Sequence, residues 1–95
     1  MPDHHILQNS QFCPVCSEEI AFQARYPRYV CMDCASIATD INGRKLLFYN
    51  VDASGGFLAF YADTNEIYDS HQCFINGLEC RADEAKFGGI VIQVN

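Results

Sequence analysis

The sequence is short of basic residues: six lysines and arginines stand against twelve acids, for a net charge of −6. This balance argues against broad binding to nucleic acids or to anionic membranes. The sequence shows no glycine-rich phosphate loop, no nucleophile elbow and no recognisable pair of catalytic carboxylates. We therefore expect a protein that is not an enzyme. A chain of 95 residues is long enough for one domain with a single modest core.

Long apolar runs are missing as well. The run Ile90–Val94 has the length of a strand, and no stretch is long enough to cross a bilayer. The first ten residues have neither the basic start nor the apolar segment of a signal peptide. We therefore expect a cytoplasmic protein with no membrane partner.

Cysteine, in contrast, is abundant, with six residues in the chain. Without an export signal a reducing compartment is expected, and there metal binding is a better explanation of many cysteines than disulfides. Two Cys-x2-Cys pairs, Cys13 with Cys16 and Cys31 with Cys34, are separated by 14 residues. The other two cysteines, Cys73 and Cys80, lie far downstream.

The two close pairs predict one tetrahedral metal site. Each Cys-x2-Cys turn presents two thiolates from one bend, so two facing turns supply the four sulfurs that structural zinc requires. The intervening residues 17–30 are sufficient for a strand out and a strand back, with Tyr26-Pro27 near the bend. We predict Cys13, Cys16, Cys31 and Cys34 as the ligands of one structural Zn²⁺. Four protein ligands leave no open position for a substrate, and iron in the same cage would make an electron carrier.

This pattern resembles the zinc ribbons and the related rubredoxin-like knuckle domains over about residues 12–41. The resemblance implies the same four cysteines as metal ligands. Such knuckles often carry glycine directly after the second cysteine of a pair, where a positive φ is needed. Here Ser17 and Ala35 occupy these two positions.

The rest of the sequence predicts β-structure. The pairs Asn42-Gly43 and Asn76-Gly77 are strong signals for tight hairpin turns. One short helix is expected at Ala82–Phe87, before Gly88-Gly89. Strands are expected at Ala21–Gln23, Arg28–Cys31, Ser36–Ile41, Lys45–Val51, Phe57–Ala62, Glu66–Tyr68, Cys73–Ile75, Leu78–Cys80 and Ile90–Val94. The predicted fold is mainly β: a single domain with a flexible tail (1–11), a zinc ribbon of small hairpins (12–41) and an antiparallel sheet (42–95).

The downstream cysteines allow three interpretations. A two-residue turn at Asn76-Gly77 places Cys73 opposite Cys80 on one face of a hairpin. They could be reduced core residues, or a disulfide across the strands. They could also join His71, with His4 or His5, in a second metal site.

Charge distribution indicates the class of partner. Residues 46–95 carry seven acids and two bases, whereas residues 1–45 carry five acids and four bases. We expect an interaction module whose acidic β-domain binds a basic protein, as inhibitors and immunity-type proteins do. One alternative is a nucleic-acid-associated zinc ribbon acting through Arg25, Arg28, Arg44 and Lys45. The other is a rubredoxin-like electron carrier.

Overall fold

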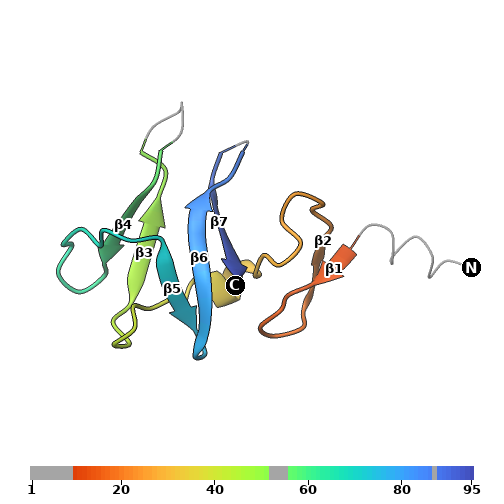
Figure 1. The fold of residues 1–95 in the computed structure, drawn as a ribbon, viewed down its shortest axis with the longest axis horizontal. Coiled ribbons are helices and arrows are strands. Elements are labelled where there is room, and N and C mark those ends of the chain that lie inside the picture. The colour runs from red at the N-terminus through yellow and green to blue at the C-terminus, as the bar shows by residue number, and fades with distance from the viewer. Residues whose placement is uncertain (1–9, 52–55, 87) are drawn as a thin grey trace, which may run out of the picture.

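The computed structural model describes residues 10–51, 56–86 and 88–95. It contains three small antiparallel sheets and one four-residue helix within these residues, so the prediction of a mainly β fold is confirmed. In Figure 1 a three-stranded sheet lies between two separate hairpins. No helix among the described residues is long and apolar enough to cross a membrane.

The first hairpin pairs β1 (Ser10–Phe12) with β2 (Glu19–Ala21), and its loop carries the first two cysteines. The short helix α2 (Met32–Ala35) follows. The second hairpin pairs β3 (Leu46–Tyr49) with β4 (Leu58–Tyr61). The tail predicted for residues 1–11 falls mostly outside the described residues, and its last two residues begin β1.

The three-stranded sheet has the order β5-β6-β7, with β5 at Gln72–Ile75, β6 at Leu78–Glu84 and β7 at Ile90–Val94. The tight turn at Asn76-Gly77 is confirmed, because both residues have a positive φ, 50° and 82°. It sets the predicted register, in which Cys73 is opposite Cys80 and Ile75 is opposite Leu78. The prediction at this hairpin succeeded because its signal is local.

Five local predictions were wrong. The strand expected at Ala21–Gln23 lies earlier in the chain, at Glu19–Ala21. The helix expected at Ala82–Phe87 does not form, because residues 82–84 continue β6 and pair with β7; Phe87 lies outside the described residues. The strand expected at Ser36–Ile41 is reduced to isolated bridges at Thr39. Tyr29 and Ile67 likewise make only single bridges where strands were expected. Pairing with distant strands, rather than local propensity, decided these segments.

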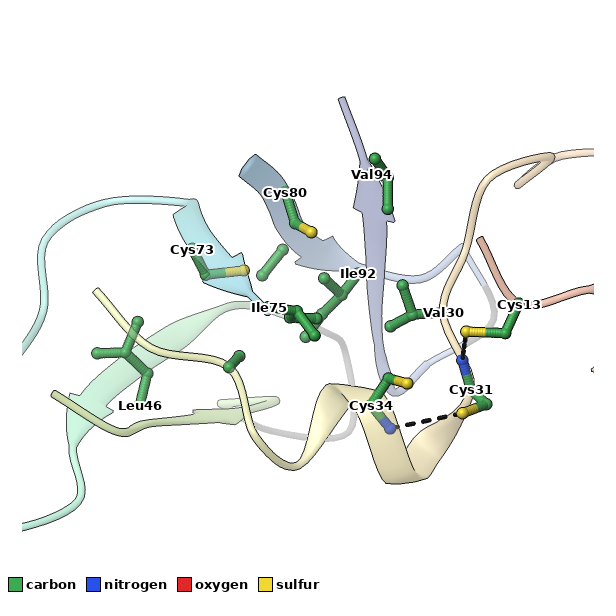
Figure 2. Packing of buried hydrophobic residues seen from close by; sticks show 12 residues of the cluster. Cys13, Val30, Cys31, Cys34, Leu46, Cys73, Ile75, Cys80, Ile92 and Val94 are labelled. Atoms are coloured by element: carbon green, nitrogen blue, oxygen red, sulfur yellow. Dashed lines mark hydrogen bonds between the residues drawn. The ribbon is translucent and has the colours of Figure 1, made fainter. Parts of the chain in front are cut away.

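The core covers one face of the β5-β6-β7 sheet. Strand alternation places Cys73, Ile75, Cys80, Ala82 and Ile92 on this face, and each of them is at most 4% exposed. Side chains from outside the sheet complete the cluster: Val30, Cys34, Ala38 and Leu46. Figure 2 shows that Cys34 and Val30 lie between this core and the side chains of Cys13 and Cys31. The cysteine site is therefore continuous with the core.

Asp40 was not singled out in the sequence, although it is the one buried charged residue among those described, at 5% exposed. Its Oδ1 accepts hydrogen bonds of 2.9 Å from the backbone N–H groups of Asn42 and Arg44. These bonds shape the turn at the predicted Asn42-Gly43 hairpin, where Gly43 has a φ of 86°. Asp40 thus shapes the loop that leads into β3.

Candidate metal centre

The first cysteine pair lies in the tight loop between β1 and β2. The backbone N–H of Cys13 donates to the carbonyl of Glu18 at 2.8 Å, and that of Ser17 donates to the carbonyl of Cys13 at 2.9 Å. Ser17 has a φ of 67°. It therefore adopts the left-handed conformation for which knuckle domains often use glycine, despite the cost of about 1 kcal/mol or more that a side chain incurs there.

The second pair lies at the start of α2 instead of in a β-hairpin. Cys31 is the N-cap of this helix, and its Sγ accepts a hydrogen bond of 3.4 Å from the backbone N–H of Cys34. Ala35 is helical, so the second position that glycine often occupies needs no positive φ here. The two halves of the site thus use different backbone structures, a hairpin loop and a helix start.

All four predicted ligands come together. The Sγ atoms of Cys13, Cys16, Cys31 and Cys34 lie within 4.8 Å of one another. A tetrahedron with metal–sulfur bonds of about 2.3 Å has sulfur–sulfur edges of about 3.8 Å. The Sγ atoms of Cys16 and Cys31 are 3.7 Å apart, which matches this edge. Cys16 is exposed and the other three are buried. The arrangement is positioned to bind one metal ion.

The backbone around Cys13 favours its thiolate. Burial alone raises the pKa of Cys13, but hydrogen bonds from the backbone of Cys16, Cys31 and Val15 together lower this pKa to about 6. The N–H of Cys31 reaches the Cys13 sulfur at 3.4 Å. Such N–H donors also stabilise the charge of metal-bound thiolates.

The pKa values of two neighbouring thiols, Cys34 and Cys16, are raised instead of lowered. Burial, followed by hydrogen bonds to the other three cysteines, raises the pKa of Cys34. A backbone hydrogen bond at Glu18 lowers the pKa of Cys16, but desolvation and the sulfurs of Cys31 and Cys13 raise it overall. Crowded sulfurs resist joint ionisation because like charges repel. A bound cation removes this repulsion, so the full thiolate set and the metal stabilise each other.

Metal affinity is therefore expected to decrease steeply with acidification. Binding must displace protons from at least Cys16 and Cys34, whose pKa values are raised. Two displaced protons predict about a hundredfold loss of apparent affinity for each unit of pH lost below neutrality. Competition with a chromophoric chelator between pH 8 and pH 6 measures this slope. A constant affinity over this range would contradict thiolate ligation.

The downstream cysteines do not belong to this site. Cys73 and Cys80 are free thiols with no exposed surface, as expected for core residues. Burial raises the pKa of Cys73 to about 12, so this thiol is unreactive near neutral pH. His71 Nδ1 contacts the carbonyl of Ala82 at 2.6 Å and a carboxylate oxygen of Asp83 at 2.9 Å. Among the described residues these side chains form no group of three metal ligands; His4 and His5 lie outside them.

Three of the four bases considered for nucleic-acid binding, Arg25, Arg28 and Arg44, have contacts within the protein. The Nε of Arg28 donates to the carbonyl of Val94 at 3.0 Å. Arg44 forms an ion pair with Asp63 at 3.0 Å, and its guanidinium lies 3.8 Å from the centre of the Tyr61 ring. Arg25 also has an interaction partner. These contacts reduce the number of bases available to phosphate.

Fold and site together define a small β-rich domain with a candidate tetracysteine metal centre at the edge of its core. No protein-family model, no curated protein and no solved structure matches the chain.

Proposed function

We propose that the chain is a small protein-interaction module whose fold is held by one structural Zn²⁺. The observation that carries the proposal is the group of four Sγ atoms within 4.8 Å of one another. Four thiolates in a tetrahedral arrangement are a donor set typical of structural zinc. With every position filled by protein, the metal has no site for water or substrate, so we infer a binding role rather than an enzymatic one.

The position of the centre supports this structural role. Three of its cysteines belong to the same buried cluster as Ile75 and Leu46. The metal would therefore join the β1–β2 hairpin, the start of α2 and the sheet. A chain of this size buries a small core, and a metal supplies the missing stabilisation.

Acidity and exposed apolar surface support an interaction role. The net charge of −6 favours association with a basic protein surface. Met32, Ile41 and Ile67 are aliphatic side chains that are 87%, 75% and 62% exposed. Because the ligands must be reduced to bind metal, we infer a reducing compartment such as the cytoplasm.

A native mass spectrum with elemental analysis tests the metal part of this proposal. For the untagged chain purified under reducing conditions, we expect one zinc per chain and two thiols, Cys73 and Cys80, that react with an alkylating agent only on unfolding. Iron in the site would instead identify a one-electron carrier, and two metal ions would contradict the single site.

The partner part requires a separate test. The metal-loaded chain should retain basic proteins in a salt-dependent manner, and the chelator-treated chain should not, because its binding surface depends on the fold. Equal retention by both forms would show that the interaction is a non-specific attraction between opposite charges. It would contradict a folded interaction module.

A further inference from the structure

An apolar groove of about 780 Å³ lies between the β1–β2 hairpin, α2, β3 and β7. Its innermost side chains are Val30, Leu46 and Ile92, which are buried parts of the core and are labelled in Figure 2. At its rim Met32 and Tyr49 are 87% and 50% exposed. A groove of this volume is within the range of ligand sites, and exposed apolar surface of this kind marks interaction sites. We call it the edge groove.

The edge groove opens onto the edges of strands. Consecutive residues of β3 (46–49) and of β7 (90–92) line it. Alternate residues of a strand point to opposite faces, so a hollow lined by consecutive residues follows a strand's edge and not one of its faces. Within the described residues β3 pairs with β4 alone, and β7 is the last strand of its sheet.

Unpaired backbone groups face the groove from β3. The carbonyl of Lys45 accepts from Ala62, next to β4, so the backbone groups of Leu46 and Phe48 point away from β4. The N–H of Leu46 donates to the carbonyl of Ala38 at 3.0 Å. No described residue makes a backbone hydrogen bond to the outward groups of Phe48.

The same holds for β7. The carbonyl of Ile92 accepts from the N–H of Val30 at 2.9 Å on the side away from β6. By alternation the backbone groups of Ile90 point to that side too. The chain after Val30 turns into α2, and none of the described residues makes a backbone hydrogen bond to Ile90. Among the described residues each edge is thus covered at one end by Ala38 or Val30. At the other end the side-chain oxygen of Asn50 accepts from the N–H of Gly89, so the free backbone groups of Phe48 and Ile90 lie between two contacts.

We propose that the edge groove binds an extended apolar segment of a basic partner protein, which adds backbone hydrogen bonds at Phe48 and Ile90. An open strand edge is a template for another strand, and the adjacent hollow accepts its alternate side chains. This inference rests on the proposed interaction role and specifies the surface that performs it.

The net charge of the chain favours a basic occupant. Lys45 is the one charged residue among those that line the groove, and the exposed acids lie next to lining residues: Glu19 precedes Ile20, Asp33 follows Met32, and Glu84 is opposite Ile90. A second copy of the chain would bring another net charge of −6 against this rim, which opposes self-association. A segment with basic residues beside its apolar ones complements both the groove and its rim.

A synthetic nine-residue peptide of alternating valine and threonine, with a lysine at each end, is a suitable probe. Titrated into the zinc-loaded chain at 0.15 M salt, it should cause saturable amide NMR shifts centred on Phe48 and Ile90. A peptide with proline in place of its central valine should bind at least tenfold more weakly, because proline removes a backbone donor. A peptide with glutamate ends should also bind more weakly.

Two matched variants test the location. Met32 lies in the groove and Ile41 does not, and both are exposed aliphatic side chains. Met32→Lys should weaken binding of the lysine-ended peptide at least fivefold, whereas Ile41→Lys should change it less than twofold, because salt screens distant charges. Zinc content, measured for both variants, verifies that each retains its fold.

Three outcomes would overturn the groove as the partner site. They are shifts centred away from Phe48 and Ile90, groove shifts that depend on the chain's own concentration without peptide, and no binding at millimolar peptide. The first would leave the proposed interaction role in place, because the peptide binds at another surface. The second would identify a second copy as the occupant. The third, combined with salt-dependent retention of basic proteins, would also reject only the groove.

Discussion

The Cys31→Ser variant is expected to lose both its zinc and its cooperative fold. Cys31 supplies one of the four sulfurs, caps α2 and is 7% exposed. Structural zinc contributes an apparent binding free energy of about 10–16 kcal/mol that is available only to the folded chain. This is as large as the whole stability of an ordinary domain, about 5–15 kcal/mol. Circular dichroism during thermal unfolding, with the zinc content measured in parallel, tests the expectation.

Cys80→Ser is the matched control for this loss. The substitution is chemically identical and the site is fully buried, but Cys80 is not part of the metal centre. The thiol of Cys80 donates to the carbonyl of Leu78 at 3.4 Å, and a serine hydroxyl can make the same bond. We expect bound zinc and a loss of about 1–2 kcal/mol, the lower part of the range for buried polar substitutions. If Cys80→Ser released the zinc while Cys31→Ser retained it, the assignment of the centre would be wrong.

The second large effect is expected from Ile75→Ala. Ile75 has no exposed surface and is the largest of the fully buried side chains among the described residues. Removing its outer carbons leaves a cavity in the buried cluster that also contains Cys73 and Leu46. Isoleucine-to-alanine changes in cores cost about 2–5 kcal/mol, a large part of the stability of a small domain. Urea unfolding of the zinc-loaded protein measures this difference.

Ile41→Ala provides the comparison for Ile75→Ala. Ile41 is 75% exposed and follows the buried Asp40 in a turn. Its truncation should change the free energy of unfolding by less than about 0.5 kcal/mol. Equal losses in both variants would show that Ile75 does not lie at the centre of the core.

The ligand set was predictable because its information is local. In each pair the cysteines are separated by two residues. This spacing places both sulfurs on one side of a turn, whether the turn is a hairpin loop or the start of a helix. This explains why the four cysteines meet even though Cys31 and Cys34 lie in a helical turn instead of the expected β-knuckle. The register of Cys73 and Cys80 was predictable for the same reason, since the Asn76-Gly77 turn fixes it.

Other elements depend on residues that are far apart in the sequence. Residues 82–84 have a helical pattern but form strand, because β7 pairs with them residue by residue. Thr39 bridges both Lys45 and Phe74, so its segment is held by two distant partners without becoming a strand itself. Local propensities are small beside such pairings and the burial that they allow.

The sequence alone predicted the cluster of four cysteines, the mainly β fold and the Asn76-Gly77 hairpin, since the spacing within each cysteine pair, the strand-forming residues and the turn residues are all local signals. Only the tertiary structure decided that the metal centre joins the core and that an apolar groove opens between β3 and β7. Both features are contacts between segments separated by tens of residues. No spacing in the sequence encodes such contacts, because they form only when hydrophobic burial brings these segments together.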